Sequence, residues 1–166
     1  MAEVCDIGIE DAEPADARRI LEIQREAFAP AAERYHIPDL PPLVETVGEV
    51  EQAIREHVVL KAVDAAGRVV GAVRGEDREG CVYVGRLVVD RAEQRRGIAT
   101  RLMVELETRF PDAGCFELFT GNFNEPGMGL YLKLGYTELR RERVRGVLEA
   151  VYLRKPGPAS HAADTS

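Results

Sequence analysis

The chain has 166 residues with 22 Lys plus Arg and 29 Asp plus Glu, so its formal net charge is −7. This length fits one domain, and a hydrophobic fraction of 45% excludes a disordered chain. The negative charge argues against a general nucleic-acid-binding protein, because such proteins present a basic face to phosphate.

The first part of the chain alternates a strand and helices. Val4–Ile9 is short and apolar and predicts a strand, whereas Ala17–Phe28 repeats apolar residues at helical spacing. Ala29–Pro42 predicts a loop, because it is rich in Pro and its Pro-Pro doublet prevents a continuous helix. Glu45–Glu56 predicts a second helix.

The middle of the chain predicts three strands and a helix. Short turns separate the apolar runs His57–Asp64, Arg68–Gly75 and Cys81–Asp90, which favours antiparallel hairpins. The apolar period then changes, and Gly97–Arg109 predicts a helix of three to four turns.

The C-terminal part predicts a strand, a helix and a strand pair: Cys115–Thr120, Glu125–Leu134, Thr137–Arg145 and Val147–Lys155. Asn124 is placed to cap the helix. Residues 156–166 are rich in Pro, Ala and Ser and predict a disordered tail. We therefore expect a single α+β domain over residues 1–155 with a mainly antiparallel sheet.

Cysteine usage and the apolar runs indicate a cytoplasmic protein. Cys5, Cys81 and Cys115 are far apart and odd in number, so we expect buried, reduced thiols. No apolar run is long enough to cross a bilayer, and no leader pattern opens the chain. We therefore expect no membrane partner. The three His residues lack the spacing of metal ligands, so we also expect no metal.

The most informative segment is a strand that enters a charged loop, a glycine and a helix. The N-terminus of a helix carries unpaired N–H groups and a partial positive charge. Gly97 leaves the backbone accessible, and Arg95, Arg96 and Arg101 add positive charge to the turn. Phosphate suits such a turn, although the P-loop and dinucleotide motifs are absent. A solvated basic loop is the alternative interpretation.

The turn carries a family signature. Gln94–Ala99, read as QRRGIA, resembles the (Q/R)xxGx(G/A) signature of the GNAT superfamily, the Gcn5-related N-acetyltransferases. Arg86–Asp90 resembles the central strand of that family. Asn124 followed by Leu130–Tyr136 resembles its "N … LYxKLGF" segment. Because two separated motifs occur in the right order, the resemblance is specific, and it covers about residues 3–155.

The resemblance implies an overall fold and a branch of the family. The fold would be the acyl-CoA N-acyltransferase fold, a mixed, mostly antiparallel seven-stranded sheet flanked by about four helices. Glu117–Gly121 and Pro41–Thr46 are similar to a bacterial branch whose substrate is unassigned.

The resemblance also implies acetyl-CoA as co-substrate. In this family the pantetheine pairs with the central strand where two strands splay apart, and the pyrophosphate rests on amides of the turn. The implied cofactor-binding residues are Leu87, Val88, Val89, Gln94, Arg95, Arg96, Gly97, Ile98, Ala99, Thr100 and Asn124. For Asn124 a helix cap is the alternative, and Gly127 and Gly129 depart from the family's helix at this point.

Tyr131 aligns with the general acid of the family, so the resemblance implies an N-acetyltransferase. A primary amine would attack the thioester directly in a ternary complex, because no Cys is placed to carry the acetyl group. The N–H of Val88 would stabilise the oxyanion, and Tyr131 would protonate the leaving thiolate. Arg86 would contact the substrate or form a structural ion pair. The general base is left open among Glu45, Glu76 and Glu117.

Two other functions remain as alternatives. One is a non-catalytic module that binds or senses CoA with the same fold. The other is a small DNA- or RNA-binding domain that uses Arg140, Arg141, Arg143 and Arg145, the last three on one face of a strand, although a solvated edge strand explains these residues better. We expect no nucleic-acid partner, a small-molecule or peptide amine as acceptor, and leave a homodimer open. The acceptor would bind against the loop Pro30–Pro42 and the helix Val44–Glu56. The acidic residues there, Glu33, Asp39 and Glu45, suit a cationic amine, although surface solvation explains them equally.

Overall fold

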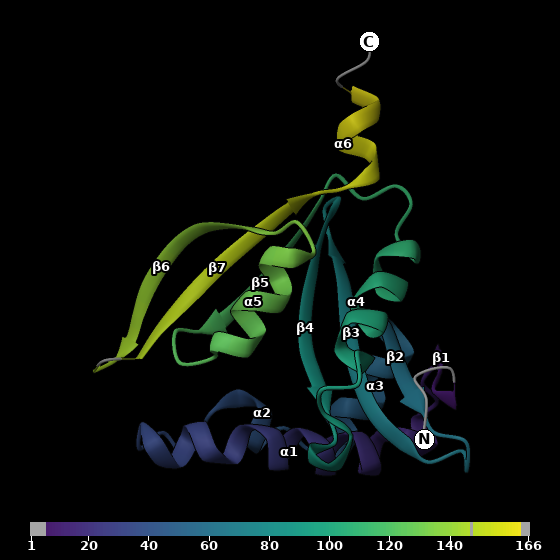
Figure 1. Cartoon of the computed structure of the whole chain (residues 1–166), viewed down its shortest axis with the longest axis vertical. Coiled ribbons are helices and arrows are strands. Elements are labelled where there is room, and N and C mark those ends of the chain that lie inside the picture. Colours follow the sequence, from purple (N-terminus) through teal and green to yellow (C-terminus); the bar gives the residue numbers. More distant parts are fainter. Residues whose placement is uncertain (1–5, 147, 164–166) are drawn as a thin grey trace. The chain divides into compact units, whose positions relative to one another are not determined.

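The computed structural model describes residues 6–146 and 148–163 (Figure 1). Seven strands form a mixed sheet in the order β1-β2-β3-β4-β5-β7-β6, which confirms the expected α+β fold. The chain divides into two compact units, residues 1–75 with 86–109 and residues 76–85 with 110–166. Within the described residues, no helix has both the length and the apolar character needed to cross a membrane.

The elements follow the expected alternation closely. The strands are β1 Gly8–Asp11, β2 Val58–Val63, β3 Val69–Arg78, β4 Cys81–Val89, β5 Cys115–Gly121, β6 Thr137–Arg145 and β7 Leu148–Pro156. The helices are α1 Ala17–Arg34, α2 Pro41–Val44, α3 Val47–Glu56, α4 Ile98–Thr108, α5 Glu125–Lys133 and α6 Pro158–Ala163. Two 3-10 turns, η2 Pro14–Asp16 and η3 Arg91–Glu93, precede α1 and α4.

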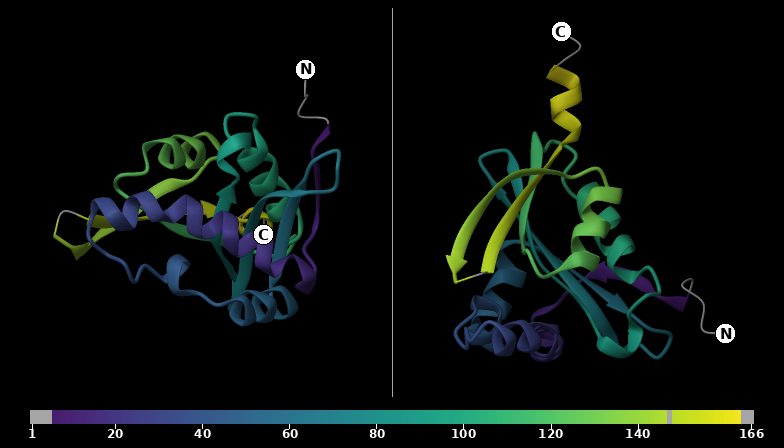
Figure 2. Two further views of the ribbon diagram at one scale, coloured as in Figure 1. Left: turned by 90° about the horizontal axis from the view of Figure 1, so that it is seen from below. Right: turned by 60° about the vertical axis from the view of Figure 1, so that its left-hand side comes forward.

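The first unit packs helices on both faces of its strands. One core cluster joins α1 and α3 to β2, β3 and β4, and it contains Ile20, Val50, Ala72 and Val88. On the other face, a Cβ at Gly71 would lie 3.3 Å from Leu102 of α4. Neighbouring strand residues point to opposite faces, so Gly71 points away from the core cluster that contains Ala72. Because Gly71 has no side chain, α4 can approach this face, which is opposite α1 and α3 (Figure 2).

Helix α1 is longer than the sequence predicts. It continues through Pro30 and ends at Arg34, where a loop was expected. Ala31 and Ala32 are buried in its last turns, so packing offsets the backbone hydrogen bond that Pro30 cannot make. The expected break does occur at the Pro-Pro doublet, but a short helix, α2, begins there, because Pro is tolerated in a first helical turn.

The second unit contains β5, β7 and β6 in antiparallel pairing, together with α5 and α6. Alternate residues of β5 and β7 face its core, among them Phe116, Leu118 and Leu153, which are buried. Edge strand β6 is exposed along its whole length. The unit therefore buries one face of a strand pair and leaves the last strand to solvent.

The C-terminal segment is more ordered than the predicted tail. Strand β7 extends to Pro156, and helix α6 follows it. The N–H of Gly157 donates to the carbonyl of Gly114 at 3.0 Å, and that of Ala159 donates to Ala113 at 3.0 Å. These backbone bonds fix the start of α6 against the segment before β5.

Two of the cysteines form a disulfide, so the expectation of three reduced thiols is wrong. β4 and β5 pair in parallel, and Cys81 lies opposite Cys115 in that register. Their Cα atoms are 4.6 Å apart and their sulfurs are bonded, a separation that a disulfide bridges without backbone movement. Cys5 lies outside the described residues.

We expect this bond to withstand denaturation without reductant. Alkylation of the unfolded, unreduced chain should modify one Cys per molecule, and alkylation after reduction should modify three, as read by intact mass. Reduction should lower the free energy of unfolding by about 2–4 kcal/mol. A Cys81→Ser/Cys115→Ser variant should lose this response to reductant, and modification of all three Cys before reduction would contradict the pairing.

Candidate functional site

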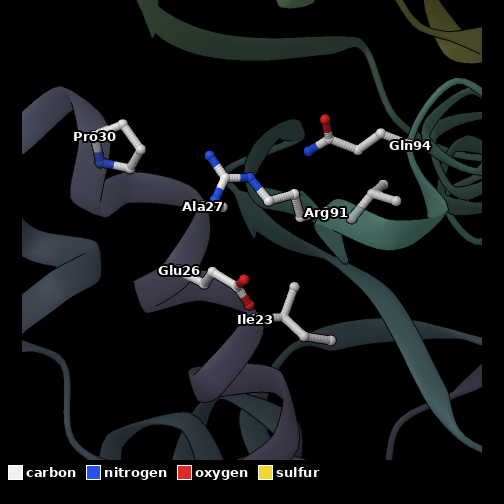
Figure 3. Close-up of a pocket in the computed structure, with 7 residues that line it drawn as sticks. Ile23, Glu26, Ala27, Pro30, Arg91 and Gln94 are labelled. Atoms are coloured by element: carbon white, nitrogen blue, oxygen red, sulfur yellow. The ribbon is translucent and has the colours of Figure 1, made fainter.

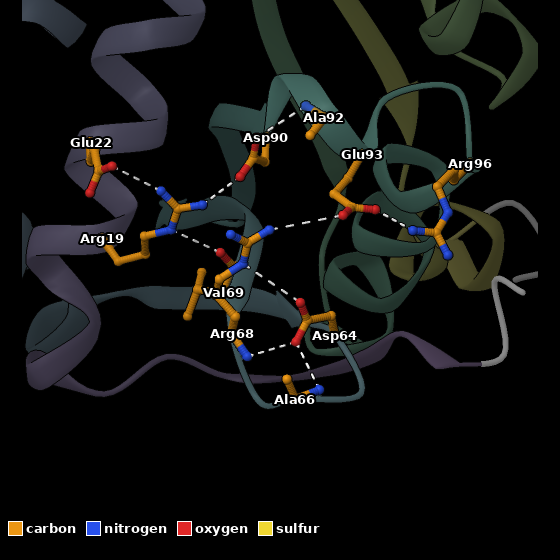
Figure 4. A network of polar contacts seen from close by, with 10 residues as sticks. All are labelled: Arg19, Glu22, Asp64, Ala66, Arg68, Val69, Asp90, Ala92, Glu93 and Arg96. Atoms are coloured by element: carbon orange, nitrogen blue, oxygen red, sulfur yellow. Dashed lines mark hydrogen bonds and ion pairs between the residues drawn. The ribbon is translucent and has the colours of Figure 1, made fainter. Parts of the chain in front are cut away.

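The end of β4 is anchored before it enters the loop to α4. The N–H of Asp90 donates to the carbonyl of Val70 at 2.8 Å, and the Asp90 carboxylate accepts from the N–H of Ala92 at 3.1 Å. Arg19 of α1 forms an ion pair with the same carboxylate and donates to the carbonyl of Val69 at 3.1 Å (Figure 4). These contacts hold the strand end, the loop and α1 in one arrangement.

The loop leads into α4. Among the described residues, no side chain caps the N-terminus of this helix. Arg95 and Gly97 both adopt left-handed backbone conformations, with φ of 67° and 77°. Gly97 occupies the N-cap position of α4, and a Cβ built there would meet no atom within 4 Å. The first-turn N–H groups and the helix dipole therefore form an anion-binding position with open space beside Gly97.

The arginines of this turn do not all add free positive charge to it. Arg96 forms an ion pair with Glu93, and the guanidinium of Arg101 donates to the carbonyl of Ile7 at 2.6 Å. Glu93 also lies 4.0 Å from Arg68 (Figure 4). The ion pair with Glu93 thus partly neutralises the expected basic cluster, whereas the carbonyl contact leaves the charge of Arg101 in place, and the backbone amides of the α4 N-terminus add to the positive character of the turn.

A pocket of about 150 Å³ lies between α1 and the end of β4 (Figure 3). Its walls come from two chain segments: Ile23, Glu26, Ala27 and Pro30 of α1, and Val89, Arg91 and Gln94 after the strand. Figure 3 shows the Arg91 side chain extending towards α1. The pocket combines an apolar wall with one carboxylate, one guanidinium and one amide, and the predicted residues Val89 and Gln94 both line it.

A second polar group surrounds Glu45, between α2 and α3. Arg74 of β3 forms a bidentate pair with its carboxylate at 3.1 Å for both bonds, and Gln24 of α1 donates to it at 3.0 Å. The Nε of Arg86 lies 3.6 Å from the same carboxylate, and Arg25 donates to the Glu45 carbonyl at 3.2 Å. We call Gln24, Glu45, Arg74 and Arg86 the Glu45 cluster.

The charges of this cluster bear on two roles that were considered for Glu45, those of general base and of attracting a cationic amine. Burial alone raises the pKa of Glu45, but hydrogen bonds from Arg74 and Gln24 and the charges of Arg74 and Arg86 place this pKa below its ordinary value. Glu45 is therefore an ionised, paired group, which does not suit the expected role of attracting a cationic amine. The other general-base candidates, Glu76 and Glu117, pair with Arg78 and Arg154.

Tyr131, in the second unit, lies on α5 with 8% of its surface exposed. Burial raises the pKa of Tyr131 to about 12, because an apolar environment disfavours the phenolate. Its ring meets that of Tyr136 edge to face, with centroids 6.1 Å apart. The phenol therefore keeps its proton at neutral pH, as a proton donor must.

Asn124 caps α5, which was one of the two roles considered for it. Its Oδ1 accepts from the N–H of Gly127 at 3.1 Å, and its Nδ2 donates to Thr120 at 2.9 Å. A Cβ at Gly127 would lie 2.2 Å from that Nδ2. The unusual glycine in the first turn thus makes room for the cap, and a cofactor contact by Asn124 stays a prediction.

We expect Gly127→Ala to displace the Asn124 side chain and destabilise the second unit. Loss of an N-cap costs about 1 kcal/mol, which thermal or urea unfolding would measure. Gly129→Ala is the matched control, because a Cβ at Gly129 meets no atom within 4 Å and should stabilise the helix slightly. Equal effects of the two substitutions would contradict this explanation.

The arginines of β6 are interleaved with acidic residues. Arg141 pairs with Glu138 at 2.8 Å and lies 3.8 Å from Glu149. Arg140 pairs with Glu142 at 3.0 Å. At least two of the four arginines of this strand are therefore paired with carboxylates, which interrupts a continuous basic face.

Sequence reasoning missed Gln24 and Arg74. Arg74 lies within a predicted strand and carries no motif. Gln24 carried a detectable signal, because it follows Ile20 by four residues and Leu21 by three, which places a polar side chain on the apolar face of α1. In the structure Gln24 is fully buried.

Comparison with known proteins gives the family. The model of the Acetyltransferase (GNAT) family matches residues 17–136, which is most of the chain. The chain belongs to the GNAT acetyltransferase family. A curated relative, the UPF0157 protein YqkA of Bacillus subtilis (strain 168), is 26% identical over 137 residues. That match covers 82% of this GNAT chain and 39% of YqkA, so the chain spans about two fifths of its relative.

Solved structures share the GNAT fold at low sequence identity. The PaiA N-acetyltransferase of Thermoplasma acidophilum, in complex with coenzyme A, has a TM-score of 0.75 at 17% identity, with 90% of this chain and 98% of that one covered. YncA of Salmonella typhimurium, with acetyl-CoA, has a TM-score of 0.74 at 17% identity, with 91% and 94% covered. A phosphinothricin acetyltransferase of Sinorhizobium meliloti, with acetyl-CoA, has a TM-score of 0.76 at 19% identity, with 95% and 91% covered.

The residues that the GNAT signature implies fall in both units of the chain. Leu87, Val88, Val89 and the turn from Gln94 to Thr100 belong to the first unit, where they form one continuous segment with α4. Tyr131 and Asn124 belong to the second unit, on α5 and at its cap.

Proposed function

We propose that this protein transfers the acetyl group of acetyl-CoA to a primary amine by direct attack in a ternary complex. The observation that carries the proposal is the N-terminus of α4, which has a left-handed Gly97 at its cap position and no capping side chain among the described residues. Such a terminus suits a pyrophosphate, which would accept hydrogen bonds from the amides of the Gln94–Thr100 turn. The Thr100 side chain is exposed beside these amides.

The backbone of Leu87–Val89 would bind the pantetheine. Within the described residues, β4 pairs with β5 over Cys81–Tyr83 and Cys115–Glu117, so this pairing does not use the backbone groups of Leu87–Val89. Backbone amides can bind an extended ligand as an added strand would. The N–H of Val88, whose side chain is buried, would stabilise the oxyanion.

Tyr131 would act as the general acid. The amine nitrogen forms a bond to the thioester carbon and gives a tetrahedral oxyanion. The carbon–sulfur bond then breaks, and the sulfur takes the phenolic proton as free CoA leaves. The nitrogen loses its extra proton to water, and the Tyr131 phenolate takes a proton back from water, which restores the phenol for the next turnover. The phenol carries its proton at neutral pH, because burial raises the pKa of Tyr131 to about 12.

Calorimetric titration with acetyl-CoA, followed by a thiol-release assay with a panel of primary amines, tests the proposal. We expect saturable binding and amine-dependent release of one thiol per acetyl group transferred, with the acetylated amine confirmed by mass. Binding without thiol release for any amine would favour the non-catalytic CoA-binding module. Absence of binding would overturn the cofactor assignment itself.

A further inference from the structure

We propose that the pocket between α1 and the end of β4 binds the ammonium group of the acceptor, and that Glu26 takes a proton from it before attack. We call this cavity the α1 pocket; it has a volume of about 150 Å³ and lies entirely in the first unit. The inference rests on the proposed acetyltransferase function and names both a base and a substrate class for it. Glu26 was not among the base candidates that the sequence suggested.

The α1 pocket reaches the end of the strand to which the chemistry is assigned. Val89 lines it, and Val88, whose N–H is assigned to the oxyanion, is one residue away, about 3.4 Å along a strand. The ion pair between Arg19 and Asp90 holds α1 to the residue that follows Val89. Both walls of the pocket are therefore fixed relative to the proposed reaction segment.

The carboxylate of Glu26 is available to accept a proton. It lines the pocket from an exposed position on α1, and no group of the described residues forms a hydrogen bond or ion pair with this side chain. Glu22, one helical turn earlier, pairs with Arg19 instead, and the three carboxylates that the sequence suggested are all paired with arginines. An exposed, unpaired carboxylate can exchange a proton both with a bound amine and with water.

A second hydrogen-bond acceptor comes from the proline within α1. In an α-helix the N–H of one residue donates to the carbonyl four positions earlier, so Pro30, which has no N–H, leaves the carbonyl of Glu26 without this donor. Residues four apart lie on one face of a helix, and both of these residues line the pocket (Figure 3). A primary ammonium has three N–H donors, so it would bond this carbonyl and the carboxylate of the same residue.

The other side of the pocket limits what the acceptor can carry. Arg91 and Gln94 extend from the loop towards α1 (Figure 3), and no group of the described residues bonds either side chain. Among the described residues of the pocket, Arg91 is the only charged one besides Glu26, and its guanidinium would repel a second cation. Ile23 and Ala27 add an apolar wall. Because pockets for whole ligands have volumes of about 300–1,000 Å³, this one suits the end of a monoamine, a short carbon chain with a single ammonium.

The proposed base adds one proton transfer to the mechanism. The Glu26 carboxylate takes one proton from the bound ammonium, which leaves a neutral amine with a lone pair for the thioester carbon. The carboxylic acid then returns that proton to water, which reaches this exposed residue. The later steps are unchanged: the nitrogen loses its second proton to water, and Tyr131 protonates the sulfur.

Amines of different basicity test the role of Glu26. At neutral pH propylamine is almost wholly protonated, whereas 2,2,2-trifluoroethylamine is almost wholly neutral and needs no base. We expect Glu26→Gln to lower kcat/KM about 100-fold for propylamine, with little change for trifluoroethylamine and unchanged affinity for acetyl-CoA. The loss with propylamine should shrink as the pH rises towards about 10, because more of this amine is then neutral.

Three further variants isolate the parts of the pocket. Glu22→Gln is the matched charge control, because this side chain is 67% exposed on the same helix and lies outside the pocket lining, so it should leave both rates unchanged. Pro30→Ala restores an N–H for the Glu26 carbonyl, so KM for propylamine should rise about two- to tenfold, as loss of one hydrogen bond to the ligand implies. Arg91→Gln should raise kcat/KM for 1,3-diaminopropane relative to propylamine about fivefold, because it removes the repelling charge.

The results separate this inference from the proposed function. Equal losses with propylamine and trifluoroethylamine in Glu26→Gln, or no loss with either, would overturn the role of Glu26 and leave the acetyltransferase intact. Equal losses in Glu22→Gln and Glu26→Gln would do the same, because they would reflect the charge of α1 and not the pocket. An unchanged KM in Pro30→Ala together with an unchanged diamine ratio in Arg91→Gln would overturn the ammonium site. No thiol release with any amine in the unmodified protein would overturn the proposed function, and this inference with it.

Discussion

Tyr131→Phe should bind acetyl-CoA as the unmodified protein does and turn over at least about 100-fold more slowly. The substitution removes one hydroxyl from a buried ring and with it the proton that the leaving thiolate requires, and general acid catalysis commonly contributes about 100-fold or more. Steady-state thiol release would give kcat, and calorimetry would give the affinity for acetyl-CoA.

Tyr136→Phe is the control for this prediction, since the two rings pack edge to face and both are buried. It should keep most of the turnover. A similar loss in both variants, or unchanged turnover in Tyr131→Phe, would remove Tyr131 from the mechanism. The melting temperature of each variant would show whether the rings, rather than the hydroxyl, cause the effect.

The pKa of Tyr131 limits the pH range of that experiment. Because folding raises this pKa from 10.0 to about 12, the unfolded chain loses the proton first as pH rises. The free energy of unfolding therefore falls between pH 10 and pH 12 and is unaffected by this group below pH 10. Rates should be compared below pH 10, where we expect no loss of activity from ionisation of Tyr131.

Gly97→Val should weaken acetyl-CoA binding by at least about tenfold. A β-branched residue at a φ of 77° is strained, and relieving such strain, which costs about 1–3 kcal/mol, would move the amides of the α4 N-terminus. The new side chain would also fill the open space beside the turn, where no atom lies within 4 Å. Calorimetry with CoA and with acetyl-CoA would measure the change.

Gly67→Val separates strain from loss of the site. Gly67 has a φ of 82°, and a Cβ there also meets no atom within 4 Å, but it lies in the turn between β2 and β3. We expect a comparable loss of stability and no loss of acetyl-CoA affinity. Equal loss of affinity in both variants would contradict a phosphate-binding role for the α4 N-terminus.

Local sequence signals predicted most elements of the fold, because period and turn residues act over short distances. The apolar period identified α4, and Gly97 marked its start within one residue. Asn124 was predicted as the cap of α5, and the structure confirms it. Pro30 led to a wrong prediction of a loop, because burial of Ala31 and Ala32 extends α1 beyond a residue that disfavours helix.

Contacts between distant residues were beyond the reach of sequence spacing. Cys81 and Cys115 meet because β4 and β5 are parallel neighbours in register, which no single segment indicates. The Glu45 cluster likewise joins α1, the segment between α2 and α3, β3 and β4. The Gln94–Thr100 turn could be predicted because it is one continuous segment, whereas the Glu45 cluster could not because it is assembled from four.

The Cys81–Cys115 disulfide makes a covalent ring of the chain. The two residues are 34 positions apart, and the segment between them contains the end of β4, the Gly97 turn and all of α4. A protease that cuts once inside this ring would leave its two fragments attached until a reductant is added. Such nicked molecules would migrate as intact chains on a non-reducing gel, so clipping of the proposed cofactor turn is visible only after reduction.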